Sequence, residues 1–228
     1  MKKLAPLALL FGLALSACGS APGQLSGSRA SVGLAVSDGG SFVTVTKTFT
    51  PATPEIPAVP PSGDNPGTPA VPAVPAKTTW TTGTPGYAEF TFTSRPGSDA
   101  VHITGYRIVR DVISTATGNY EDTSKTDINK LDIYVPSGWS CPERTSSQSC
   151  AMFTPTGGQR NDVVPAEGLP SSPYRLNLAG GLANLVIATN ASVGRSTDIE
   201  FFGTSSSGQA VTVRADHIAS EGVKTGDE

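Results

Sequence analysis

Histidine, cysteine and charged residues are scarce in this chain of 228 residues. It contains two histidines, three cysteines and 15% charged residues. Zinc and copper sites need three or four converging nitrogen or sulfur ligands, so the sequence predicts neither. It also lacks a glycine-rich phosphate loop and a Gly-x-Ser-x-Gly nucleophile elbow, which removes support for nucleotide binding and for a serine hydrolase. We therefore expect no cofactor, no metal and no catalytic residue.

The two histidines, His102 and His217, each lie inside a pattern typical of a β-strand. A structural or solvent-facing side chain is the usual occupant of such a position, and nothing nearby is suited to orient an imidazole for catalysis. The sequence predicts a protein that is not an enzyme. An envelope hydrolase with an unfamiliar set of residues stays open as an alternative.

Acidic residues outnumber basic ones, with a formal net charge of -3. A nucleic-acid-binding protein needs a basic surface, so this class is excluded. Serine and threonine together number 51, and no stretch shows sustained helical spacing of apolar residues. Threonine alternating with valine or phenylalanine favours strands with one wet and one dry face. The sequence predicts an all-β fold, and the antiparallel sandwich type is implied by a family resemblance given below.

The first eighteen residues have the pattern of an export signal. Two lysines precede a short apolar run from Leu7 to Leu15, which is too short to span a bilayer. The quartet Leu15-Ser16-Ala17-Cys18 closely resembles the lipobox of bacterial lipoproteins. That resemblance implies a signal peptide over 1–17, a diacylglyceryl group on Cys18, and permanent attachment to a membrane of the cell envelope. We expect this membrane to be the outer membrane if the organism has one. The alternative is an ordinary secretory signal that leaves Cys18 as a free thiol.

Lipidation of Cys18 leaves Cys141 and Cys150 as a natural disulfide pair in an oxidising compartment. Closing a loop of that size would stabilise the fold by about 2.7 kcal/mol. The predicted disulfide staples a long loop over 137–173, which is rich in serine, glycine and proline.

We expect the mature chain to consist of a flexible lipidated tether over 18–30 and one elaborated sandwich domain over 31–228. Apolar alternation on both sides of Asp38-Gly39-Gly40 predicts a β-hairpin from residues 32–36 and 43–49. A long strand is predicted from Val101 to Ile113.

Residues 51–76 form a proline-rich insertion. Prolines recur at every third position from 51 to 60 and again from 66 to 75, separated by a short polar turn. Polyproline II has three residues per turn, so each run would form an extended arm about 30 Å long, and the second arm could fold back along the first. Two interpretations follow: a stiff arm or proline-rich ligand for an aromatic groove, or a solvated low-complexity insertion, which we favour.

The stretch from Tyr87 to Arg110 resembles the second and third strands of a fibronectin type III or related immunoglobulin-like sandwich. Residues 198–213 similarly resemble the last hairpin of such a domain. The resemblance implies an immunoglobulin-like or fibronectin III-like topology, although the tryptophan usual on the second strand is missing here, with Phe90 or Phe92 nearest its place.

Trp139 and Tyr134 are the candidate ligand contacts, because a disulfide-braced loop can present a flat ring to a sugar or protein. Trp139 capping the end of the sandwich is the alternative. The oxygen-bearing side chains from Asn119 to Asp132 match no EF-hand, and we predict a solvated acidic loop there.

The functional prediction is a lipid-anchored envelope protein that binds or scaffolds a protein or glycan partner without catalysis. A carbohydrate-binding or adhesive surface module is the alternative within the binding classes.

Overall fold

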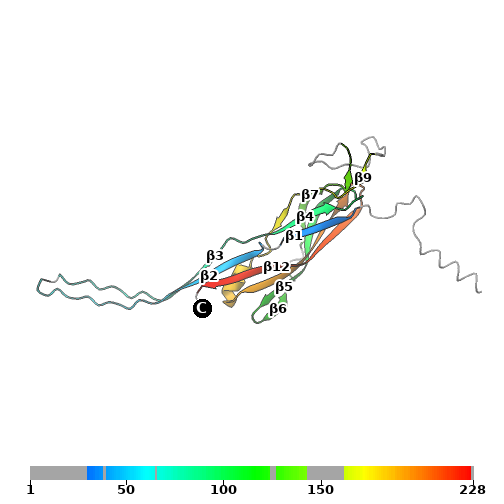
Figure 1. Ribbon diagram of the computed structural model, residues 1–228. Coiled ribbons are helices and arrows are strands. Elements are labelled where there is room, and N and C mark those ends of the chain that lie inside the picture. Colours follow the sequence, from blue (N-terminus) through cyan, green and yellow to red (C-terminus); the bar gives the residue numbers. More distant parts are fainter. Residues whose placement is uncertain (1–29, 38–39, 65, 124–126, 143–161, 227–228) are drawn as a thin grey trace, which may run out of the picture.

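The computed structural model describes residues 30–37, 40–64, 66–123, 127–142 and 162–226. These residues form strands and one short helix (Figure 1). In chain order the elements are β1 (Val32–Ser37), β2 (Phe42–Thr50), β3 (Lys77–Thr82), β4 (Ala88–Ser94), β5 (Val101–Thr115), β6 (Gly118–Glu121), β7 (Asn129–Val135), β8 (Trp139–Ser140), β9 (Val164–Pro165), β10 (Tyr174–Leu176), α2 (Leu182–Thr189), β11 (Val193–Ser205) and β12 (Ala210–Gly226). The predicted all-β character is confirmed, apart from α2.

The strands form two main sheets. The smaller has the order β1-β4-β10, and the larger has the order β3-β2-β12-β11-β5-β6, with β7 also paired to β5. Every pair in these sheets is antiparallel except β12 with β2, which is parallel. The short strands β8 and β9 pair with each other within the long loop 137–173.

The predicted hairpin of residues 32–36 and 43–49 is wrong. The segment 32–36 lies in β1, which pairs with β4 in the small sheet, whereas 43–49 lies in β2, which pairs with β12 and β3 in the large sheet. β1 and β2, consecutive in the chain, therefore lie in different layers and do not form a hairpin. Alternation of apolar and polar residues predicted both strands correctly, because it indicates that one face of a strand is buried. It does not indicate which other strand lies beside it.

The space between the two sheets is filled by an aromatic core. Phe201 on β11 lies 5.1 Å from Phe90 and 5.1 Å from Phe92, measured between ring centroids, and all three side chains are fully buried. Their positions at alternate residues of β4 and β11 follow the period of two that directs side chains of one strand to one face. This is the sandwich core.

A second apolar cluster lies under α2, at the end of the large sheet that the small sheet does not cover. Leu182 and Val186, one helical turn apart, pack with Val43 and Val193 of the large sheet. A Cβ atom at Gly222 of β12 would lie 2.7 Å from Val186, so the absence of a side chain there lets the helix approach the sheet closely. This is the helix core.

Helix α2 was not predicted from the sequence. Its apolar residues surround the helix instead of forming one stripe, so the spacing that marks an amphipathic helix is absent. Gly181 before the helix and Asn190 after it both have a left-handed backbone, with φ of 81° and 52°. These two residues define the ends of the helix.

The three long strands β5, β11 and β12 run beneath both cores and give the molecule its elongated shape (Figure 1). The hairpin of β11 and β12, turned at residues 206–209, is confirmed, as is the long strand from Val101. Within the described ranges, no helix has the length and apolar character needed to cross a membrane.

Candidate functional site

The proline-rich segment is the most exposed feature of the molecule. Thr53 pairs with Val74, Ile56 with Val71, and Val59 with Thr68, and each pair exchanges two backbone hydrogen bonds of 2.9 to 3.0 Å. The second run thus folds back along the first, as one interpretation of the sequence predicted. We call residues 51–76 the proline arm.

The proline arm continues the β2–β3 ladder without a change of register. Thr50 pairs with Lys77 at the end of the ladder, and the next pair is Thr53 with Val74. The spacing of three follows from proline, which has no N–H and cannot make a ladder bond at every second residue. The arm is therefore a direct extension of the folded sheet, and it projects from one end of the molecule (Figure 1).

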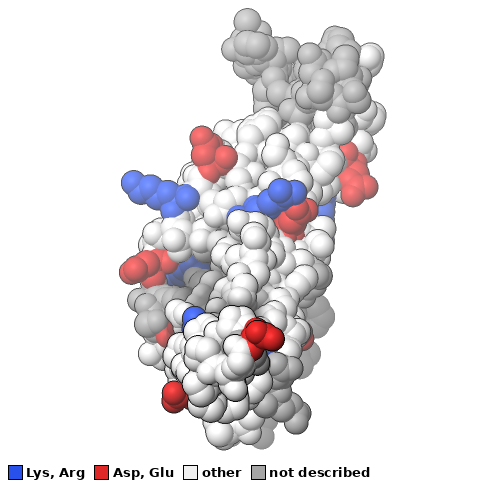
Figure 2. All heavy atoms as spheres, turned by 90° about the vertical axis from the view of Figure 1, so that its left-hand side faces the viewer, with Lys and Arg blue, Asp and Glu red and all other residues white. Residues whose placement is uncertain are grey.

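The surface of the proline arm is apolar and nearly uncharged. Its aliphatic side chains Ile56, Val59, Val71 and Val74 are 48% to 55% exposed. Glu55 and Asp64 are the charged residues of the segment. Figure 2, viewed from the end toward which the arm projects, shows a few charged side chains scattered over a surface of uncharged residues. Exposed aliphatic groups of this density are typical of contact surfaces.

A buried polar layer separates the sandwich core from the helix core. Arg195 on β11 and Asp111 on β5 form an ion pair with 3.2 Å between Nε and Oδ1, and their side chains are 5% and 1% exposed. Thr197 donates a hydrogen bond to Asp111. Alternation along β11 and β5 directs all three side chains to the inner face.

The polar layer holds the connection between β10 and α2. Nη1 of Arg195 donates hydrogen bonds to the backbone oxygens of Leu178, at 2.5 Å, and Gly180, at 3.1 Å. Ser220 of β12 donates a further bond to the oxygen of Leu178. Buried carbonyl groups of a loop are thereby satisfied, as the low polarity of an interior requires. Sequence analysis missed Arg195 and Asp111, although their inward position in an alternating strand could have indicated them.

A cavity of about 270 Å³ opens beside the polar layer, between the end of β10 and the start of β7. We call it the layer cavity. The side chains around it combine charged, amide, hydroxyl and aliphatic groups. They are Tyr106, Ile108, Asp111, Asp127, Asn129, Leu176, Asn177, Leu178, Arg195 and Thr197.

Tyr106 lies at the border of the layer cavity and the sandwich core. Its ring centroid is 6.0 Å from that of Tyr174 and 5.8 Å from that of Phe201. Burial raises the pKa of the Tyr106 phenol to about 12, and the neighbouring Tyr174 hydroxyl acts in the same direction.

The raised pKa predicts a loss of stability in alkaline solution. In the unfolded chain Tyr106 ionises near pH 10, whereas in the folded protein it stays protonated to about pH 12. The unfolded state binds fewer protons in this window, so the free energy of unfolding falls between pH 10 and about 12. Urea unfolding at a series of pH values should show a shallower fall for Tyr106→Phe than for Tyr120→Phe, a change at an exposed tyrosine. Equal slopes for the two variants would contradict the assignment.

The candidate ligand contacts Trp139 and Tyr134 are not brought together into one site. Tyr134 is 56% exposed and lines a shallow groove of about 440 Å³ between β7 and residues 170–174. Trp139 is half-buried in β8, where it pairs with Pro165, and it does not line that groove. Their roles as ligand contacts stay predictions.

The two histidines lie apart on the large sheet. His102 on β5 is bonded to Asp132 of β7. His217 lies in an irregularity of β12 with a φ of 60°, where its backbone N–H donates to Asp198 at 2.8 Å and its Nδ1 lies 4.0 Å from the same carboxylate. In the described ranges no hydroxyl or thiol group forms a hydrogen bond with either imidazole.

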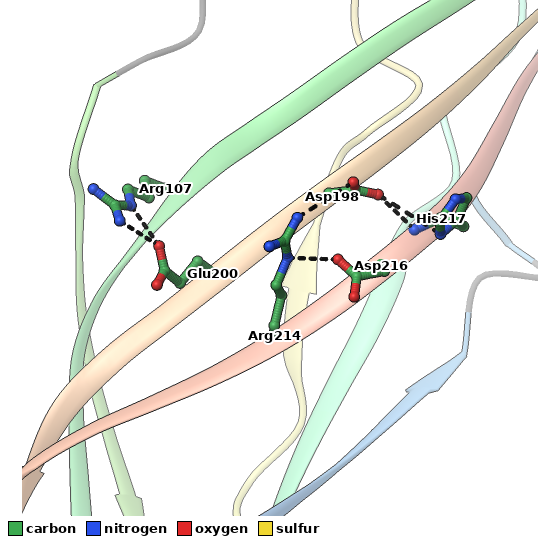
Figure 3. A network of polar contacts seen from close by, with 6 residues as sticks. All are labelled: Arg107, Asp198, Glu200, Arg214, Asp216 and His217. Atoms are coloured by element: carbon green, nitrogen blue, oxygen red, sulfur yellow. Dashed lines mark hydrogen bonds and ion pairs between the residues drawn. The ribbon is translucent and has the colours of Figure 1, made fainter.

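Asp198 of β11 is the centre of a polar network with Arg214, Asp216 and His217 of β12, and the separate pair of Arg107 on β5 and Glu200 on β11 lies beside it (Figure 3). Its side chain is 7% exposed and lies 3.6 Å from Arg214, which also bonds Asp216 at 2.6 Å. The register of β11 against β12 shifts between Thr197 and Ile199, which marks a β-bulge. The carboxylate of Asp198 accepts a hydrogen bond from the backbone N–H of His217 at this bulge. The network has a structural explanation and needs no ligand.

Several predicted positions lie outside the described residues. These are the signal peptide over 1–17, the lipid attachment site Cys18, most of the tether over 18–30, and Cys150. Cys141 follows β8 and is half-buried, and its pairing with Cys150 stays a prediction. Among the described residues, no group of three or more histidine, cysteine, aspartate or glutamate side chains could hold a metal ion.

No protein-family model matches the chain, and a comparison with curated proteins finds no match.

Proposed function

We propose that the chain is a lipid-anchored cell-envelope protein that acts by binding or scaffolding, and that it does so through the proline arm. The lipid anchor is the diacylglyceryl group expected on Cys18, and the location is extracytoplasmic. The single observation that carries the proposal is the projection of a backbone-paired, apolar, nearly uncharged arm from one end of an elongated body.

The positions of the two ends support this arrangement. β1 begins near β8 and β9, where Ser31 donates to and accepts from the side chain of Ser98. The proline arm leaves from the opposite end of the large sheet (Figure 1). In a chain anchored through residues that precede β1, the arm would therefore lie at the end of the body farthest from the attachment point.

The chemistry of the arm favours a protein partner with an aromatic-lined groove. Extended proline-rich segments are already ordered before binding, so they lose little conformational entropy in such a groove. The backbone bonds between the two runs restrict the arm further. Glu55 and Asp64 are the charged residues that the arm offers, so a strongly charged partner surface would gain little electrostatic attraction from it.

The strand order supports a fibronectin III-like or immunoglobulin-like sandwich as the supporting body. A sheet of β1, β4 and β10 packed against β7, β5, β11 and β12 has three strands on one side and four on the other, as in the seven-stranded form of that architecture. Strands β2 and β3, the proline arm and α2 are additions to it.

Two alternatives stay open, one within the binding classes and one from another class. A carbohydrate-binding or adhesive module would use exposed groups such as Tyr134, beside its groove, and Trp139 of the long loop. An envelope hydrolase would need His102, which bonds Asp132, or His217, whose Nδ1 lies 4.0 Å from Asp198.

The proposal predicts an arm-dependent crosslink in intact cells. A photoactivatable residue at Ala58 of the arm should capture one envelope protein, because that position is exposed along the apolar surface. The same photoactivatable residue at Asn119 of β6 is the control position.

The lipid anchor has a separate test. Mass spectrometry of the mature N-terminus should find Cys18 carrying a diacylglyceryl group, and Cys18→Ala should release the protein from the membrane fraction.

A matched pair of variants separates the arm's side chains from its backbone. Replacing Ile56, Val59, Val71 and Val74 by serine removes the exposed aliphatic groups, and the crosslink should be lost. The control variant Thr53→Ser with Thr68→Ser lies on the same paired positions and should retain it. A crosslink from Ala58 no stronger than from Asn119, or one that survives the four serine changes, would reject the arm as the contact.

A further inference from the structure

The layer cavity has the size of a single small ring. Its volume of about 270 Å³ corresponds to roughly nine water molecules and is just below the range of drug-sized pockets. Ile108 and Leu176 give it aliphatic walls, and Tyr106 adds an aromatic ring. The cavity can therefore cover one face of a compact ring but not an extended chain.

The charges around the cavity oppose a charged ligand. Arg195 would attract an anion, but its charge is already balanced by Asp111 at 3.2 Å, and Asp127 lines the same cavity. A cation would be attracted by the carboxylates and repelled by the guanidinium of Arg195. The buried pair of Arg195 and Asp111 is internally balanced, and the remaining carboxylate, Asp127, is exposed, so solvent screens its charge and the cavity gives a cation little advantage over a neutral ligand.

The polar groups of the cavity both donate and accept hydrogen bonds. Arg195 lines the cavity and its guanidinium carries only donors, of which Nη1 bonds the backbone oxygens of Leu178 and Gly180. Asn129 and Asn177 are exposed amides, each with a donor and an acceptor group. Hydroxyl groups on a ligand, which donate and accept at the same atom, match such a mixture.

We propose that the layer cavity binds a neutral, polyhydroxylated ring, in chemical terms one sugar unit. The polar edge of the ring meets Arg195, Asn129 and Asn177, and its C–H face packs on Tyr106, Ile108 and Leu176. This site lies apart from the Trp139 loop, and it does not rest on the proposed contact of the proline arm.

The test is an NMR titration of the full chain with isoleucine and leucine methyl groups labelled. Glucose and N-acetylglucosamine are the neutral probes, and acetate and methylamine are the charged ones. The sugars should shift the methyl signals of Ile108 and Leu176 in a saturable manner, with millimolar affinity. Acetate and methylamine should leave these signals unchanged.

A double variant assigns the binding to the cavity. Asn129→Ala with Asn177→Ala removes two exposed amides, so the fold is retained and the affinity for the sugar should fall by about tenfold. Asn119→Ala, an exposed asparagine outside the cavity, is the control and should leave the affinity unchanged. The proposal is overturned if neither sugar gives saturable shifts, if the double variant binds like the control, or if a charged probe binds in place of the sugars.

Discussion

Replacing Arg195 by alanine should lower the free energy of unfolding by about 3–5 kcal/mol, among the largest losses for any single change in this protein. The variant leaves the carboxylate of Asp111, which is 1% exposed, without its guanidinium partner. It also leaves the backbone oxygens of Leu178 and Gly180 without the bonds from Nη1. Chemical unfolding in urea, followed by far-ultraviolet circular dichroism, measures the loss.

The matched control is the exposed ion pair of Arg175 and Glu89, which links β10 to β4 at 2.6 Å. The side chain of Arg175 is 66% exposed, so Arg175→Ala should cost less than about 1 kcal/mol. A double variant with Arg195→Met and Asp111→Leu replaces both buried charges by apolar groups and should recover much of the stability. If Arg195→Ala were no more harmful than Arg175→Ala, the polar layer would have no structural role.

Alternation along the sequence predicted most of the strands, because each has one face in a core. Ala88, Phe90 and Phe92 of β4 and the long run from Val101 are found as expected. Which strands pair could not be read from the same pattern. The β1–β2 connection crosses between layers, and β12 continues past the sandwich to pair in parallel with β2, both of which depend on contacts far apart in sequence.

The proline arm shows how a local rule can be right while its context is missed. The spacing of three predicted two extended runs, and the polar turn between them indicated that the second could fold back along the first; the structure has both. The low-complexity composition favours a solvated insertion, because composition carries no information on register. The observed pairs keep the register of the β2–β3 ladder, and this continuity ties the arm to the folded body.

The polar layer and its cavity could not be predicted from the sequence, for a different reason. Arg195 and Asp111 lie 84 positions apart and meet only because β11 pairs with β5. A charged residue at an inward position is the one available signal. Histidine and tryptophan are conspicuous as residue types, whereas Arg195 and Asp111 are informative only through their inward positions in the strand pattern.

Replacing Phe201 by alanine should destabilise the protein by about 3–5 kcal/mol, because this ring contacts Phe90, Phe92 and Tyr106 at the centre of the sandwich core. The adjacent Phe202 is the control: its side chain is directed to the other face and is only half-buried, so Phe202→Ala should cost less than half as much. Urea unfolding gives both values. Equal losses would mean that Phe201 is not the centre of the core.

The same variant tests whether the two cores unfold together. Trp80 packs against the helix core, far from Phe201, so its fluorescence in a Trp139→Phe background reports on the end of the molecule that the mutation does not touch. Because β5, β11 and β12 run through both cores, Phe201→Ala should lower the urea midpoint seen by Trp80 as much as the midpoint seen by circular dichroism. An unchanged Trp80 midpoint would instead show that the helix core, with the proline arm that extends from β2 and β3, is stable without the sandwich.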